Sequence, residues 1–277
     1  MAAPNALRPT REWPLFILAV ALVLAVCVPL WQATLDPDEG GTGAQWSRAR
    51  LARLFLGPEQ IATYACLVFA LFILAGRWSE VRRQRRAFSL DLLPVGQVVL
   101  VDDARDLQRR IDDRAGPGGP YLLASMLRVA LGKFATSKSS RDVAEIVRTQ
   151  ADLSLSRLVT SMATVHYLAW AIPSIGFLGT VRGLAGSLTV DSTEESALKR
   201  FIKDATGHLN VAFDCTLVAL AASLVLMFLV HGMQRQEEEL VIDCQQYALD
   251  HLVSRLYELE PESHALDPAD LDRRATA

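Results

Sequence analysis

The amino-acid sequence predicts an all-α membrane protein: four transmembrane helices, a helical cytoplasmic loop and a cytoplasmic helical extension of the last span. Three observations carry this prediction. Hydrophobic residues make up 51% of the 277-residue chain and gather in long runs that are nearly free of charge. The charged residues crowd the segments between these runs, as they do in membrane proteins. Basic residues cluster directly after the second run, which assigns that side to the cytoplasm.

The first apolar run extends from Trp13 to Trp31 without a charged residue. It is longer than the roughly 7–15 apolar residues of a signal peptide, and tryptophans at both ends are typical of a membrane interface. We therefore interpret it as a retained span. The second run, 60–76, lies between Glu59 and Arg77, and the third lies between Arg157 and Arg182.

The fourth run covers 211–230 and is interrupted only by Asp214. Five arginines between 77 and 86 place the end of the second span in the cytoplasm, and four spans then put both termini there. The predicted segments are the N-terminus and first span (1–31), a periplasmic segment with an interfacial helix (32–58), the second span (59–76), a cytoplasmic helical loop (77–157), the third span (158–186), a second periplasmic segment (187–210), the fourth span (211–231), a cytoplasmic helix (232–260) and a disordered tail (261–277).

The soluble segments show helical periodicity. The short helix predicted around 46–56 either lies on the membrane surface or packs on the bundle, and the pattern fits both. In the cytoplasmic loop, 121–134 and 142–158 are predicted amphipathic helices. The second can continue directly into the third span, because no Pro or Gly lies between 142 and Pro173.

After the fourth span, apolar residues at gaps of three and four form one stripe of a helix. These are Leu240, Cys244, Tyr247, Ala248, His251 and Leu252. An apolar stripe requires a covering surface, so the stripe predicts self-association in the cytoplasm.

Two spans carry stripes of small residues. In the third span these are Gly176, Gly179, Gly183 and Gly186, and in the fourth they are Ala212, Cys215, Ala219 and Ser223. Small residues let two helices approach closely in lipid, where packing replaces the missing hydrophobic drive. We expect both stripes to form close-packing helix interfaces, and we expect Pro173 to kink the third span.

Thr180 and Thr216 lie on these stripes at a similar depth, about 8–9 Å from the outer ends of their spans at 1.5 Å per residue. Each threonine alone is adequately explained by a hydrogen bond to its own i−4 carbonyl. The matched pair favours a role in an ion pathway. Asp214 is also a candidate, because an acid inside a span is costly. It lies about 160° from Thr216 around the helix, so an interfacial structural role is equally compatible with its position.

Other classes of function receive little support. A net charge of −3 gives no strongly basic face for nucleic acid. The four cysteines fall singly, so no disulfide, metal site or cofactor is predicted. Ser174, Ser223 and His166 offer no convincing pairing of nucleophile and base, and we do not expect an enzyme. His166 and Arg182 are interpreted as interfacial anchors.

The string Gly-Phe-Leu-Gly-Thr-Val-Arg-Gly at 176–183 resembles the Gly-Leu-Leu-Gly-Thr-Val-x-Gly signature of the MotA/TolQ/ExbB proton-channel family. The segment 211–231, with Thr216, is similar to the final span of that family. Four spans with a cytoplasmic loop between the second and third resemble the MotA arrangement. Asp214 departs from the small or neutral residue of many relatives, and the loop shows nothing of the flagellar torque-generating pattern.

The resemblance implies a proton-channel subunit of an ion-driven motor in the bacterial inner membrane. It implies a homopentamer around two copies of a single-span MotB/TolR/ExbD-like protein, whose Asp carries the proton past Thr180 and Thr216. The alternative is a tetraspan scaffold that conducts no ions. A scaffold should tolerate Val at both threonines, whereas a proton path should not.

Overall fold

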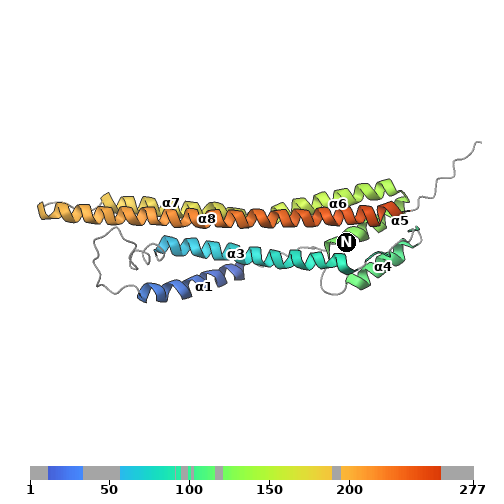
Figure 1. Ribbon diagram of the computed structural model, residues 1–277, viewed down its shortest axis with the longest axis horizontal. Coiled ribbons are helices and arrows are strands. Elements are labelled where there is room, and N and C mark those ends of the chain that lie inside the picture. The colour runs from blue at the N-terminus through green and yellow to red at the C-terminus, as the bar shows by residue number, and fades with distance from the viewer. Residues whose placement is uncertain are drawn as a thin grey trace, which may run out of the picture. The chain divides into compact units, whose positions relative to one another are not determined.

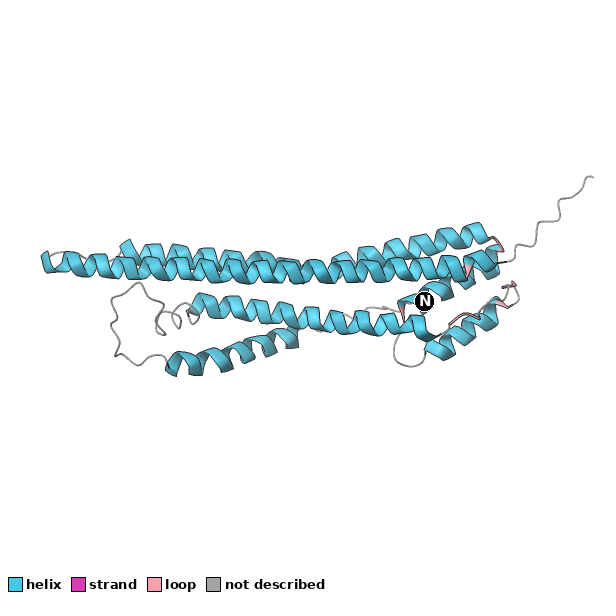
Figure 2. Cartoon of the chain, in the orientation of Figure 1, coloured by secondary structure: helices cyan, strands magenta, loops and turns pink. Residues whose placement is uncertain are grey.

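The computed structural model describes residues 12–33, 57–90, 92–94, 99–100, 103–115, 121–188 and 195–256. Within these ranges the regular structure is helical (Figure 2). The predicted interfacial helix and the tail at 261–277 lie outside the described residues. Among the described residues, four helices are long and apolar enough to cross a membrane, which confirms the predicted all-α membrane fold.

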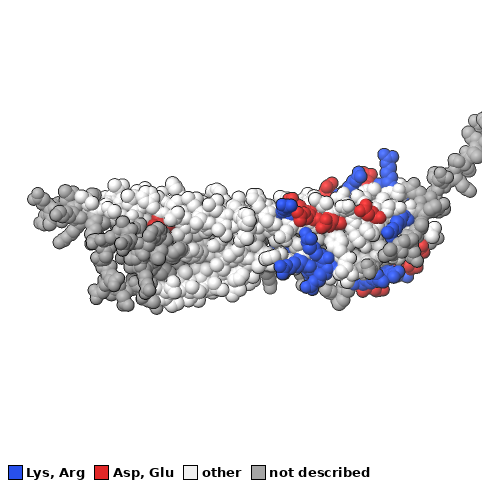
Figure 3. Space-filling model, viewed as in Figure 1, with Lys and Arg blue, Asp and Glu red and all other residues white. Residues whose placement is uncertain are grey.

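The chain forms two compact units. The membrane unit comprises the described residues between 7 and 82 and between 156 and 238, and the soluble unit comprises those between 83 and 155 and after 239. On the face shown in Figure 3, Lys, Arg, Asp and Glu side chains gather over the soluble unit, while the surface of the membrane unit is nearly free of them. This division is expected where one surface meets lipid and the other meets water.

The membrane unit contains α1 (Glu12–Ala33), most of α3 (Pro58–Arg85), α7 (Ala163–Leu188) and much of α8 (Glu195–His251). Figure 1 shows α7 and α8 running side by side. Apolar side chains join α1 to α3: Val23 and Cys27 pack against Ile61, Tyr64 and Val68. Many other large apolar side chains of these helices are exposed on the single chain, as expected for surfaces that face lipid or neighbouring proteins.

The predicted continuous helix into the third span is interrupted at one residue. Helix α6 (Ser140–Ser161) ends, Met162 intervenes, and α7 begins at Ala163. The Met162 N–H donates to the carbonyls of both Leu158 and Val159 at 3.2 Å, a shared bond of the kind seen at helix ends. Neither Pro nor Gly marks this break, so the sequence pattern did not reveal it.

Helix also extends into the predicted second periplasmic segment, 187–210. Helix α7 continues to Leu188 and α8 begins at Glu195. Apolar composition marks the depth of the hydrocarbon layer, whereas helix continues wherever backbone hydrogen bonding is favourable, and the two boundaries therefore differ.

The soluble unit is built around α4 (Ala104–Ala115) and α5 (Leu122–Ser137), together with η1 (Arg86–Leu90) and η2 (Val253–Arg255). Helices α4 and α5 pack against each other, and the Gln108 amide donates to the Arg128 carbonyl at 3.0 Å. At the start of α5 the Leu122 N–H donates to the side chain of Gln84 at 2.8 Å. This bond satisfies one of the unpaired N–H groups at the start of a helix.

The apolar stripe at the end of α8 is covered by the chain itself. Four residues of the stripe are buried within the single chain: Leu240, Cys244, Ala248 and Leu252. The ring of Tyr247 packs edge-on against that of Phe88, with 5.9 Å between the ring centroids. Near the end of the described chain, Val99 forms a parallel bridge with Leu256. The stripe is therefore covered within the single chain and does not by itself require a second copy, so self-association stays a prediction that rests on other grounds.

Candidate ion-pathway site

The glycine stripe of α7 packs directly on the small-residue stripe of α8. A methyl group added to Gly176 would lie 2.5 Å from the Ala219 Cβ, and one added to Gly183 would lie 2.7 Å from the Ala212 Cβ. Both separations are shorter than any real contact between methyl groups. At these levels the two backbones are as close as glycine permits, which is the geometry of small-residue packing in membranes.

The other small residues differ in their roles. A methyl added to Gly179 would lie 2.8 Å from the Cys215 Cβ. A methyl added to Gly186 would instead lie 3.1 Å from Nδ1 of His208, which is outside the α8 stripe. Ser223 donates a hydrogen bond to the Ala169 carbonyl of α7 at 3.3 Å. Pro173 lies inside α7.

Close packing brings the two threonine hydroxyls together. The Oγ1 atoms of Thr180 and Thr216 are in hydrogen-bond contact between α7 and α8. Thr180 also lies 3.1 Å from the Gly176 carbonyl, and Thr216 lies 3.2 Å from that same carbonyl and 3.3 Å from the Ala212 carbonyl. The i−4 bonds and the inter-helix contact therefore occur in one cluster.

This hydroxyl cluster has more acceptors than protons. Each hydroxyl carries one hydrogen and can accept two, so Thr180 and Thr216 hold two protons for the two neighbouring carbonyls, of Gly176 and Ala212, and for each other. Several arrangements of donor and acceptor are possible at nearly the same geometry. The two hydroxyls can therefore redistribute their hydrogen bonds without movement of either helix.

Asp214 lies two residues before Thr216 and is half-buried on α8. The hydrogen bonds of the hydroxyl cluster run to Gly176 and Ala212 and between the threonines, and do not include the Asp214 carboxylate. Its position two residues away places it on another face of the helix.

An acid that sequence reasoning did not select lies beside this cluster. Glu59, in the first turn of α3, is buried and forms a two-point ion pair with Arg182 of α7. The Arg182 Nε lies 2.8 Å from Glu59 Oε1, and Arg182 Nη2 donates to Glu59 Oε2 at 3.0 Å. The paired, planar geometry is the strong form of an Arg–carboxylate contact.

Glu59 had the appearance of a flanking charge because it borders the second apolar run. Arg182, within the glycine motif, was interpreted as an interfacial anchor. The available signal was Arg182 itself, since a cation in a packed span requires a counter-charge. Only the fold shows that Glu59 supplies it.

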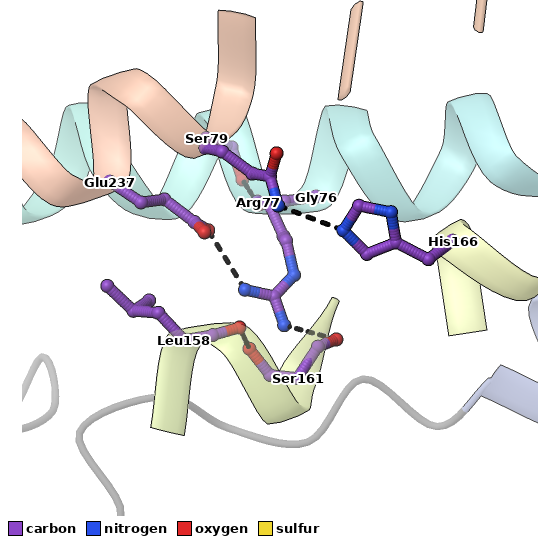
Figure 4. Close-up of polar contacts among 8 residues, drawn as sticks. Gly76, Arg77, Ser79, Leu158, Ser161, His166 and Glu237 are labelled. Atoms are coloured by element: carbon purple, nitrogen blue, oxygen red, sulfur yellow. Dashed lines mark hydrogen bonds and ion pairs between the residues drawn. The ribbon is translucent and has the colours of Figure 1, made fainter. Parts of the chain in front are cut away.

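A second polar cluster lies where the membrane unit approaches the predicted cytoplasmic side (Figure 4). Arg77 of α3 donates to Glu237 of α8 at 2.9 Å and to the Ser161 carbonyl at 2.8 Å. Ser161 is the last residue of α6, so Arg77 satisfies a carbonyl exactly where the helix is interrupted. His166 and Gln234 are joined nearby at 2.9 Å.

Within the described ranges, no group of His, Cys, Asp and Glu side chains has the arrangement of a metal site. The four cysteines are free thiols. Among the described residues, the polar contacts of the membrane unit include the hydroxyl cluster, the Glu59–Arg182 and Arg77–Glu237 pairs and the His166–Gln234 contact.

Fold and site together define a helical membrane protein whose third and fourth spans are packed through small residues around a hydroxyl pair. Residues 120–246 match the sequence model of the MotA/TolQ/ExbB proton channel family, which confirms the resemblance of this segment to that family. The matched segment comprises 127 of the 277 residues, less than half of the chain. It covers α7 and the α8 threonine, whereas α1 and Glu59 lie outside it. No curated protein matches the chain significantly.

Proposed function

We propose that this protein is the proton-channel subunit of an ion-driven motor in the bacterial inner membrane, and that it couples proton flow to rotation or force on a single-span partner. The observation that carries the proposal is the Thr180–Thr216 contact between two close-packed spans. It lies within the segment that matches a family of proton channels.

In this proposal the hydroxyl pair hydrogen-bonds to an acid carried by the partner. Protonation of that acid removes a buried charge and allows the partner to move past the close-packed helices. A proton-carrying acid on the partner is compatible with the described spans of this chain, because the Glu59 carboxylate is already paired with Arg182. Asp214, near the predicted outer end of the fourth span, remains a candidate for contact with the ion.

The proposed assembly is a homopentamer around two copies of a MotB/TolR/ExbD-like protein, with both termini in the cytoplasm. Support comes from the family match and from the exposed apolar side chains on α7 and α8, including Phe177, Leu224 and Phe228. Such surfaces face either lipid or neighbouring copies of the chain. The cytoplasmic orientation rests on the arginines that follow the second span.

Proton uptake into liposomes that contain this chain and its one-span partner tests the proposal. We expect Thr180→Val combined with Thr216→Val to reduce uptake to the level of empty liposomes, because Val keeps the shape and removes both hydroxyls. The combined Ser substitutions should retain uptake. Thr206→Val is a matched control, since Thr206 of α8 makes an i−4 bond to Ile202 and is exposed.

Uptake that survives in the double Val variant with the complex intact would contradict the hydroxyl pathway. Uptake that requires neither threonine nor partner would favour a different route through the bundle. A complex that assembles normally yet never conducts, under conditions that activate related motors, would favour the tetraspan scaffold.

A further inference from the structure

The Glu59–Arg182 pair has an unusual distribution of exposure. The Glu59 side chain is 10% exposed, whereas the Arg182 side chain is 59% exposed on the single chain. The carboxylate is thus enclosed by protein, and the guanidinium reaches out from it. Water therefore screens the guanidinium, whereas the enclosed carboxylate depends on the guanidinium to compensate its charge.

The pair lies immediately beside the hydroxyl cluster. Glu59 Oε2 is 3.9 Å from the Cys215 sulfur, and a methyl on Gly179 would lie 3.1 Å from Glu59 Cγ. Gly179 and Cys215 directly precede Thr180 and Thr216 in the sequence. The absence of a side chain at Gly179 therefore accommodates both α8 and the Glu59 side chain at the level of the threonines.

The surroundings of Glu59 are also polar on its own helix. Gln60 and Thr63 are buried, and neither polar atom of the Gln60 amide has a hydrogen-bond partner among the described residues. Unpaired polar groups in a membrane-embedded position are costly, which indicates that this end of α3 is not organised solely for packing.

We propose that Glu59 acts as an electrostatic positioning residue that neutralises Arg182 at the outer approach to the hydroxyl pair, so that a proton or other cation can reach it. This inference rests on the proposed function. Without Glu59, the Arg182 charge would stand unpaired next to the path and repel the approaching cation. Without Arg182, the carboxylate would attract it.

The proposal predicts an asymmetry between the two partners. In the assembled complex, Glu59→Gln should lower proton uptake by at least about tenfold, the effect that one unit charge exerts even from about 12 Å away at an effective dielectric constant of about 20. Arg182→Gln should leave uptake equal to or above that of the wild type. The double variant should recover most of the uptake lost in Glu59→Gln. All rates are normalised to the amount of assembled complex.

A structural role predicts a different result, because loss of either partner would then impair assembly and uptake alike. Arg182→Gln therefore decides the question even if Glu59→Gln fails to assemble: a loss of uptake in Arg182→Gln overturns the proposal. Wild-type uptake in Glu59→Gln overturns it equally. Asp142→Asn is the matched control, since it breaks the exposed Lys133–Asp142 pair of the soluble unit and should leave uptake unchanged.

The combined Thr180→Val and Thr216→Val variant separates this inference from the proposed function. If uptake does not depend on the threonines, the hydroxyl pathway itself is wrong. If uptake requires the threonines but responds identically to Glu59→Gln and Arg182→Gln, only the electrostatic role of Glu59 is overturned.

Discussion

Helix α3 is tied to its neighbours by an Arg–Glu pair near each end of the membrane unit, and the two pairs differ in construction. Near the predicted outer end α3 supplies the acid, Glu59, and at the predicted inner end it supplies the base, Arg77. Arg77 and Glu237 are 13% and 4% exposed, so both partners are enclosed. Arg182, in contrast, is more than half exposed.

The surroundings of the two pairs differ as well. Arg77 also satisfies the Ser161 carbonyl at the interruption between α6 and α7, so a single side chain supports three helices. The outer pair lies next to the Thr180–Thr216 hydroxyls. The comparison teaches that the same pair of residue types occurs in two environments, one with both charges enclosed and one with the guanidinium accessible, and only the second is compatible with the proposed control of an ion.

The largest effect is expected at the inner pair. Arg77→Gln leaves the Glu237 carboxylate enclosed without a partner and frees the Ser161 carbonyl, which should cost about 3–5 kcal/mol. Thermal unfolding in detergent measures this loss. Combining Arg77→Gln with Glu237→Gln should recover part of the lost stability. An Arg77→Gln protein as stable as the wild type would contradict the structural role of the enclosed pair.

Close packing around the hydroxyls should be nearly as sensitive. Gly176→Val places a side chain against Ala219 and should cost about 1–3 kcal/mol through overpacking, with loss of proton uptake. Gly232→Ala is the matched control within α8, because nothing lies within 4 Å of an added methyl there. It should be neutral or slightly stabilising, since Ala is the better helix former. Equal effects at both glycines would argue against a specific α7–α8 contact.

A smaller change in stability is expected at the outer pair. Arg182→Gln leaves the enclosed Glu59 carboxylate without its partner, but water already screens the exposed guanidinium, so we expect a loss of about 1–2 kcal/mol, smaller than that of Arg77→Gln. The same unfolding assay then compares the loss of stability in Arg182→Gln directly with that in Arg77→Gln. A loss at Arg182 as large as that at Arg77 would show that both pairs are architectural.

The smallest effect concerns a thiol in the soluble unit. Burial raises the pKa of Cys244 to about 12, with a smaller contribution from the negative charge of Asp243. Since the thiolate is the reactive form, iodoacetamide should leave Cys244 of the folded protein unmodified from pH 7 to 9 and modify it after denaturation. Mass spectrometry of the labelled peptide measures this. Rapid labelling of the folded chain would show that the α8 stripe is not enclosed by the chain alone.

Part of the site could be predicted because it depends on local periodicity. The spacing of Gly176, Gly179 and Gly183 defines one face of a helix whatever surrounds it, and Thr180 and Thr216 were placed at one depth by counting residues from the span ends. Glu59 could not be selected in this way, since it lies more than 120 positions before Arg182 and borders an apolar run like any flanking charge. The interruption at Met162 had no Pro or Gly to mark it.

The sequence by itself determined the four spans, the helical class and the small-residue stripes, because these follow from hydrophobic runs and from the 3.6-residue period of a single helix. The tertiary structure decided which polar groups meet. It joined Glu59 to Arg182 and Arg77 to Glu237, and it covered the α8 stripe with the chain's own helices. The physical reason is that pairing between distant segments depends on how the helices pack in three dimensions. The local pattern of residues does not specify which helices become neighbours.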